Sequence, residues 1–277
     1  MNQNEIKALV SLLDDDDYEV INHIKEKIIS MGDVLIPFLE TAWENNFSPV
    51  VQRRIEELIH TLQLQSLQER FRDWKDNEQE DLLKGIWLVA CFQYPDLDLR
   101  KVTKELDKIY HEVWLSHRAY ASPHDKVKNL NNILFTKLGF SSNTQNFHSP
   151  GNSMINIVLE SRKGNPISLC IVYMLIAQKL KMPIYGINLP NIFVLTYKSE
   201  ETQFYINAFN RGLIFSRSEI DNYIAQLNIP TTNRFYYPCS NLEIIQRIMR
   251  NLVVAFEKLN EDEKARELKE LLQVLDA

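Results

Sequence analysis

Apolar residues recur every three or four positions through most of the first 138 residues, which is the spacing of helices that bury one face. Glycine often ends a helix because it tolerates positive φ, and Gly32 and Gly139 follow two of these runs. Pro123 precedes the last run, at a position where its missing N–H costs no hydrogen bond. The pattern predicts separate helices over residues 6–13, 20–31, 50–62, 67–74, 82–90, 99–114 and 123–138.

The pattern changes after Gly139. Residues 141–153 are polar and contain Pro150-Gly151, which predicts a loop. The apolar segment 167–180 then predicts another helix. Short apolar runs separated by Pro190 and by a charged turn predict strands over residues 184–188, 192–197 and 204–207.

Two serines are each followed three residues later by a glutamate, the arrangement of a capping box at a helix start. They are Ser216 with Glu219 and Ser240 with Glu243. The second pair opens a helix that we expect to form a hairpin with a last helix over residues 261–275. These elements predict an α+β fold that is mainly helical, with a central helix packed on a small antiparallel sheet.

Charge and hydropathy exclude several classes of partner. The chain has 277 residues with 31 basic and 37 acidic side chains, a net charge of -6, and its basic residues are interspersed with acidic ones. This balance gives no basic patch for nucleic acid or for an anionic membrane surface. No segment approaches the roughly 20 apolar residues of a membrane span, and the first residues lack the features of a signal peptide. We expect a cytoplasmic protein, and the sequence does not indicate an oligomeric state.

The sequence predicts no metal and no cofactor. Cys91, Cys170 and Cys239 are far apart and form no Cys-x-x-Cys pair, so we expect free thiols. The acidic run at residues 14–17 lacks the alternating ligands and central glycine of a calcium loop and predicts a solvated turn. His111 and His117 are six residues apart, unlike the four-residue spacing of zinc helices.

Several short motifs lie between residues 130 and 216. They are Leu130-Asn131-Asn132-Ile133-Leu134-Phe135, Leu138-Gly139-Phe140, Arg162-Lys163-Gly164-Asn165-Pro166-Ile167-Ser168-Leu169, Gly186-Ile187-Asn188-Leu189-Pro190 and Asn207-Ala208-Phe209-Asn210-Arg211-Gly212. In order and spacing they resemble the transglutaminase-like superfamily, whose members share a papain-like core. The chain is most similar to a bacterial branch with a tetratricopeptide-type carboxy-terminal extension, whose first helix resembles residues 241–252.

The resemblance also implies a domain organisation. Residues 1–66 resemble HEAT-type helical repeats, with too few units to form a stable solenoid alone. Residues 67–138 are expected to be helical and to pack on the core, residues 139–230 to form the transglutaminase-like core, and residues 231–277 to form a tetratricopeptide-like hairpin.

Active members of the superfamily use a cysteine at the start of the central helix, a histidine on the second strand and an aspartate on the third. The helix start and the imidazolium stabilise a thiolate, which attacks an amide carbonyl. Alignment on the motifs places Pro166, Ile192 and Asn207 at these three positions. None of them can form a thiolate or move a proton, so the resemblance implies a fold without its catalytic groups.

Cys170 is an alternative nucleophile, one helical turn after Pro166. Its neighbours, Leu169, Ile171 and Val172, are apolar, and an apolar setting raises the pKa of a thiol. His148 is the histidine nearest to the predicted core in sequence and is the candidate base.

A polar cleft is expected to remain at the mouth of the core. The alignment places there Asn165, Ser168, Asn188, Asn191, Asn207, Asn210 and Arg211. Amide side chains suit peptide backbone or other neutral polar ligands, and an arginine suits a carboxylate. Asparagine also favours turns and strand ends, so these residues have a structural explanation as well.

The sequence therefore favours a non-catalytic module that binds a protein or peptide partner. Two alternatives stay open: a cysteine-type amide hydrolase or acyltransferase that uses Cys170, and a protein that binds small molecules or peptides in the cleft.

Overall fold

The computed structural model describes residues 8–15, 17–116 and 121–276. Ile6, Asp16 and His117, which belong to patterns considered above, lie outside these residues. The chain divides into two compact units, Met1–Arg72 and Asp73–Ala277. The site discussed below lies in the second unit.

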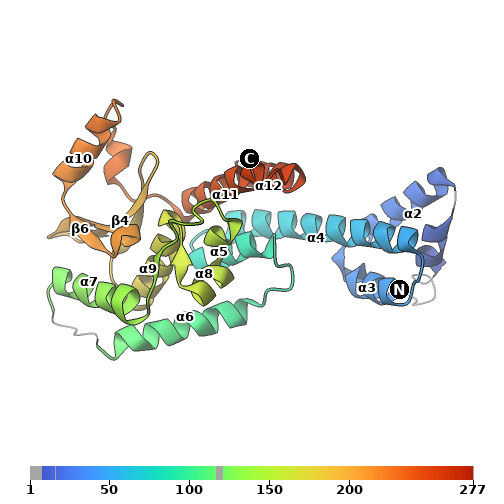
Figure 1. Ribbon diagram of the computed structural model, residues 1–277, viewed down its shortest axis with the longest axis horizontal. Coiled ribbons are helices and arrows are strands. Elements are labelled where there is room, and N and C mark those ends of the chain that lie inside the picture. Colours follow the sequence, from blue (N-terminus) through green and yellow to red (C-terminus); the bar gives the residue numbers. More distant parts are fainter. Residues whose placement is uncertain (1–7, 16, 117–120, 277) are drawn as a thin grey trace. The chain divides into compact units, whose positions relative to one another are not determined.

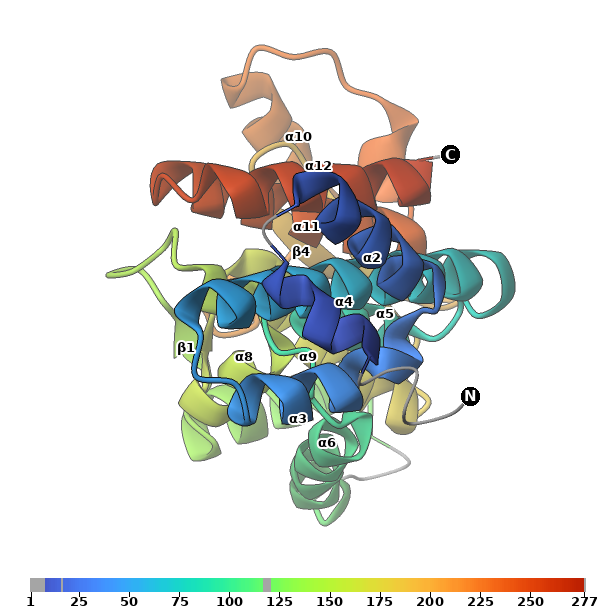
Figure 2. The same ribbon diagram turned by 90° about the vertical axis from the view of Figure 1, so that its right-hand side faces the viewer.

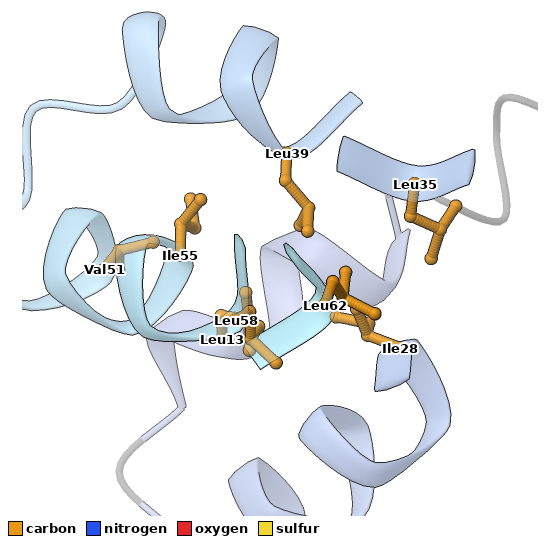
Figure 3. Packing of buried hydrophobic residues seen from close by; sticks show 8 residues of the cluster. All are labelled: Leu13, Ile28, Leu35, Leu39, Val51, Ile55, Leu58 and Leu62. Atoms are coloured by element: carbon orange, nitrogen blue, oxygen red, sulfur yellow. The ribbon is translucent and has the colours of Figure 1, made fainter. Parts of the chain in front are cut away.

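The first unit is helical. It contains α2 (Tyr18–Ser30), α3 (Ile36–Glu44) and most of α4 (Pro49–Asn77), with two short 3-10 turns, η1 (Leu12–Asp14) and η2 (Asp33–Leu35). Gly32 between α2 and η2 has φ +81°, which an L side chain rarely adopts. Figure 3 shows one buried face from each element meeting in a shared core, made by Leu13, Ile28, Leu35, Leu39, Val51, Ile55, Leu58 and Leu62.

The prediction of separate helices over residues 50–62 and 67–74 is wrong, because α4 is one continuous helix of 29 residues. The four residues between the two predicted segments, 63–66, include neither glycine nor proline. Leucine and glutamine among them favour a helix, so nothing local interrupts the backbone.

The second unit is built on one antiparallel sheet. Its strands follow one another in sequence order, β3 (Ile184–Asn188), β4 (Phe193–Lys198), β5 (Gln203–Asn207) and β6 (Leu213–Phe215). The register pairs Ile187 with Val194 and Thr196 with Tyr205. The three predicted strands are confirmed to within one residue at each end, and so is the α+β fold.

Helices surround this sheet, and α9 and α10 lie on different sides of it in both ribbon views (Figures 1 and 2). The helices of the unit are α5 (Leu82–Cys91), α6 (Leu99–Trp114), α7 (Pro123–Asn131), α8 (Ile155–Ser161), α9 (Pro166–Lys179), α10 (Arg217–Gln226), α11 (Asn241–Lys258) and α12 (Asp262–Asp276). A π-helix, η3 (Asn132–Lys137), directly follows α7, and short 3-10 turns, η4 (Pro150–Ser153), η5 (Ala208–Asn210) and η6 (Asn233–Tyr236), join other elements. The expected hairpin at the end of the chain is confirmed, since α11 and α12 pack together.

Helix α9 is the centre of the unit. All of its residues from Ile167 to Ala177 are buried. The helix contacts β3 and β4 on one side and α6, α8 and α11 elsewhere around its circumference. A helix that is apolar on every face needs such a complete cover, which explains why its sequence shows no polar stripe.

Both capping boxes are confirmed. The Ser240 hydroxyl accepts the Glu243 N–H at 3.2 Å, and a Glu243 carboxylate oxygen accepts the Ser240 N–H at 2.8 Å. Glu219 likewise accepts the Ser216 N–H at 2.8 Å at the start of α10.

The predicted loop over residues 141–153 is wrong at its two ends. Ser141–Ser142 form β1, which pairs in parallel with β2 (Lys163–Gly164), and Pro150–Ser153 form η4. Helix α8 was not predicted at all. It has only seven residues, too few for a periodic pattern, and it is stabilised by burying Ile155, Val158 and Leu159.

Gly85 in α5 lies directly against the buried indole of Trp74. A Cβ at this position would lie 2.6 Å from Cζ2 of Trp74 and 3.0 Å from Cγ1 of Ile245. We expect Gly85→Ala to lower the free energy of unfolding by about 1–2 kcal/mol, because overpacking outweighs the gain of about 1 kcal/mol in helix propensity. Urea denaturation followed by circular dichroism measures the change.

Trp74→Phe provides the control, because it removes the ring atoms that the new Cβ would contact. In that background Gly85→Ala should lower the free energy of unfolding by clearly less than it does in the wild-type chain. Equal costs in both backgrounds would contradict the packing explanation.

Candidate functional site

The start of α9 is held by a network of buried polar groups. The Asn165 carbonyl oxygen Oδ1 accepts the Ser168 N–H at 2.9 Å, and the Ser168 hydroxyl accepts the Asn165 N–H at 3.0 Å. The Asn165 amide donates to the Ser153 hydroxyl at 2.9 Å. These bonds engage both ends of the Asn165 amide, and Asn165 and Ser168 are 7% and 2% exposed. Their side chains therefore cap the helix.

A small pocket opens at this end of α9. Its volume is about 160 Å³. Asn165, Pro166 and Ile167 form its floor, and the turn before β4 and helix α11 contribute further walls. Its remaining lining residues are Phe147, His148, Ser149, Ser153, Asn191, Phe193, Arg247, Asn251, Val254 and Ala255. Pro166, which the sequence resemblance assigns to the nucleophile position, is thus part of the floor of the pocket.

Arg247 is the cationic group on the α11 wall. Its Nη1 donates to Asn188 Oδ1 at 2.6 Å and to the Leu189 carbonyl oxygen at 3.3 Å. Both acceptors are neutral. Burial and the nearby Arg250 lower the pKa of Arg247. The side chain is therefore a partly desolvated cation without a carboxylate among the described residues.

The loop before η4 forms another wall. His148 Nε2 lies 2.7 Å from Lys258 Nζ, which fits a neutral imidazole accepting from the ammonium. The Phe147 ring packs edge-on against Phe209, with 6.2 Å between the centroids. This wall therefore combines an aromatic surface with a second cationic group beside the pocket.

Cys170 lies deeper in α9 and is completely buried. Its thiol donates to the Phe193 carbonyl oxygen at 3.6 Å. Burial raises the pKa of the Cys170 thiol far above its ordinary value. Burial also raises the pKa of Cys239 to about 12. Neither environment stabilises a thiolate.

The structure brings some of the predicted site residues together. Asn165 and Asn191 line the pocket, and Asn191 adopts φ +61° in the turn before β4. Asn188 does not line the pocket, but its Oδ1 accepts a hydrogen bond from Arg247, which does.

Other predicted positions lie outside the pocket lining. Ile192 packs against the cluster between the sheet and α10, which includes Val194 and Ile220. Asn207 caps η5 by accepting the Asn210 N–H at 3.1 Å. Asn210 and Arg211 are exposed, and Arg211 has φ +50° at the end of η5. Of the three positions that the resemblance assigns to the triad, only Pro166 lines this pocket, and Ile192 and Asn207 do not.

The α11 wall was missed by the sequence reasoning. Arg247, Asn251 and Val254 lie about 80 residues after Pro166, on a helix whose pattern predicts an ordinary hairpin. Because the contact depends on how α11 packs across the start of α9, no local signal marks these side chains as part of a site.

A second hollow of about 490 Å³ lies near α6 and α8. Two buried atoms that line it, Asn156 Oδ1 and Arg162 Nη1, have no hydrogen-bond partner in the described structure. Its lining carries both signs of charge, Lys101 and Arg162 with Glu105 and Glu160, so it shows no preference for a charged ligand.

Comparison with known proteins places the site in a family context. The family model described as "Transglutaminase-like superfamily" matches residues 100–250, more than half of the chain. This range contains α9, the sheet and the Arg247 wall. No solved structure matches this chain.

Curated relatives include bacterial and animal proteins. A "UPF0162 protein" of Xylella fastidiosa (strain 9a5c) is 29% identical over 205 residues, covering 69% of this chain and 70% of the relative. A "UPF0162 protein" of Vibrio cholerae is 26% identical over 141 residues, covering 50% of this chain and 52% of the relative. "F-box only protein 21" of Homo sapiens is 23% identical over 207 residues, covering 64% of this chain and 32% of the relative.

Within the described residues, none of the helices combines the length and the apolar character needed to cross a bilayer.

The network at Asn165 leads to a prediction about stability. We expect Asn165→Ala to lower the free energy of unfolding by about 1–3 kcal/mol, because it removes a helix cap and leaves a buried N–H without an acceptor. Asn210→Ala is the matched control. Asn210 is exposed and its contact uses only its backbone, so the change should stay within about 0.5 kcal/mol. Similar losses for both variants in urea denaturation would refute the structural role of Asn165.

Proposed function

We propose that this chain, which belongs to the transglutaminase-like superfamily, is a non-catalytic member that binds a protein or peptide partner. One observation carries the proposal. Pro166 stands at the first position of α9, inside the pocket where a nucleophile would act. Proline has neither a thiol nor a titratable group.

The rest of the catalytic arrangement is also missing from the pocket. Ile192 cannot exchange a proton, and its side chain packs between the sheet and α10. Asn207 could orient an imidazole, but its Oδ1 is engaged in capping η5. His148 is the histidine that lines the pocket, and its Nε2 faces Lys258. These contacts support a pocket that recognises a ligand without covalent chemistry.

The alternative nucleophile, Cys170, is disfavoured by its surroundings. Its thiol is fully buried and donates to a backbone carbonyl oxygen, which stabilises the protonated form. A backbone hydrogen bond at Ala208 favours the thiolate, but burial outweighs it and raises the pKa of Cys170. A thiolate needs a cation or free N–H groups nearby. An amide hydrolase or acyltransferase based on Cys170 would therefore need a rearrangement of α9.

Two features support a partner-binding role: the two ends of the chain resemble helical repeats in sequence, and one relative carries a related segment within a longer chain.

 The region that matches "F-box only protein 21" makes up 32% of that human protein, so a related segment occurs there as one part of a longer chain. The HEAT-like residues 1–66 and the hairpin of α11 and α12 are the surfaces that we propose for a protein partner, because stacked helices of this kind present broad faces. The cytoplasm is the compartment that we propose, since it would keep the three cysteines reduced.

A small-molecule ligand is the second candidate, and it is favoured by the size of the pocket. A volume of about 160 Å³ holds a single side chain or a small organic molecule and is too small for a longer segment. Under either candidate the pocket recognises a ligand and performs no reaction on it.

The proposal predicts slow reaction of the native thiols. At pH 7.5 we expect iodoacetamide to label Cys170 at least about 100-fold more slowly in the native protein than in urea, because the buried thiol is protonated and inaccessible. Peptide mass spectrometry after timed quenching measures the rate for each cysteine. Rapid native labelling of Cys170, with loss of an amide-transfer activity in Cys170→Ala, would overturn the proposal.

Pro166→Cys in a Cys170→Ala background supplies the matched control. It places a thiol at the start of the same helix, within the pocket, where the helix dipole lowers a thiol pKa. We expect this thiol to react at least about tenfold faster than native Cys170. If the thiol at position 166 reacts as slowly as native Cys170, iodoacetamide does not enter the pocket. Slow labelling of Cys170 would then not support a protonated, unreactive thiol.

A further inference from the structure

The guanidinium of Arg247 has an unused edge. Its contacts to Asn188 and to the Leu189 carbonyl oxygen both use Nη1. Among the described residues, Nε and Nη2 have no acceptor, and no ion pair involves this side chain. Nε and Nη2 lie along one edge of the planar group, where two parallel N–H bonds can hold both oxygens of a carboxylate.

The charges around the pocket have one sign. Arg247 lines it, and the Lys258 ammonium contacts the ring of His148, which also lines it. No aspartate or glutamate belongs to the lining, all of which falls in the described part of the chain. Arg250, the next arginine on α11, is instead paired with Asp276 at 3.5 Å. An anion would therefore find at Arg247 a cation that the protein itself leaves unpaired.

The rest of the lining is largely apolar. Phe147, Pro166, Phe193, Val254 and Ala255 supply ring and aliphatic surface. A cavity of about 160 Å³ is close to the roughly 150 Å³ that holds a benzene ring in an engineered protein cavity. One apolar side chain of about leucine size fits this space.

From this combination we propose that the pocket binds an apolar carboxylate, with Arg247 holding the two carboxylate oxygens and the apolar group seated against Pro166 and Phe193. The inference rests on the proposed function, because it names the ligand class of the same pocket. The carboxyl terminus of a polypeptide that ends in an apolar residue and a free apolar acid share this chemistry. Asn191 and Asn251 also line the pocket, and amide side chains of this kind can bond the preceding peptide group of a polypeptide terminus.

The test is an NMR titration of the full-length protein with N-acetyl-leucine and with its carboxamide. For so small a ligand we expect the acid to bind with a Kd on the order of 1 mM and the amide at least about tenfold more weakly. A pentapeptide ending in leucine and free 4-methylpentanoate distinguish the two sources. If the pentapeptide binds more tightly than 4-methylpentanoate, the ligand is a polypeptide terminus. If the two bind equally, the ligand is a small acid.

Three variants connect the binding to Arg247. Arg247→Gln should weaken binding of the acid at least about tenfold and binding of the amide only slightly, because only the carboxylate accepts both parallel N–H bonds of the guanidinium. Arg250→Gln is the matched control from the same helix and should leave the Kd within about twofold, since an exposed charge outside the pocket acts weakly through solvent. Val254→Trp should block binding by filling the pocket, and it tests the site even if Arg247→Gln does not fold.

The outcomes separate the inference from the function on which it rests. Equal binding of acid and amide, equal losses in the two arginine variants, or no binding of any probe would overturn the carboxylate site. None of these results bears on the reactivity of Cys170, so the non-catalytic assignment would stand. The non-catalytic assignment fails through rapid labelling of Cys170, which leaves the titration unaffected.

Discussion

The complete burial of α9 is the constraint on which the second unit depends. From Ile167 to Ala177 the helix exposes no residue, so the sheet, α6, α8 and α11 must all pack against it. Such a helix must also satisfy the N–H groups at its start without help from solvent. Asn165 and Ser168 do this with their side chains, and Pro166 removes one N–H altogether. Asn165 and Pro166 also form part of the floor of the pocket, so the requirements of the helix limit what chemistry the pocket can offer.

The pocket does not depend on any single residue, because it has several independent walls. The start of α9, the turn at Asn191, the loop at His148 and helix α11 each contribute to it. On our proposal, proline in place of the superfamily cysteine at position 166 alters one of these walls and leaves the space between the others. What the remaining walls share is apolar surface and positive charge, the two properties that an apolar anion requires. The structural role of Asn165 and the ligand role of Arg247 are thus compatible, since they use different walls.

Much of the fold could be predicted from the sequence, where the signals were local. The strands beside Pro190 and the capping boxes at Ser216 and Ser240 depend on neighbouring residues, and each lies where it was expected. The continuity of α4 was missed because two amphipathic runs do not show whether the backbone between them turns. Helix α8 was missed because seven residues carry too little periodicity. The site was less predictable. Arg247 reaches it only through the packing of α11, and the direction of Ile192 toward α10 follows from strand register.

The central claim is that the pocket at α9 recognises a ligand without forming a bond to it. Intact-mass spectrometry of the native protein tests this most directly, after long incubation with p-nitrophenyl acetate and, separately, with a glutamine-containing peptide as acyl donors. We expect no stoichiometric acyl adduct on the protein, and peptide mapping of any minor adduct should place no acyl group on Cys170. A stoichiometric acyl adduct that maps to Cys170 and is released by an added amine would contradict it.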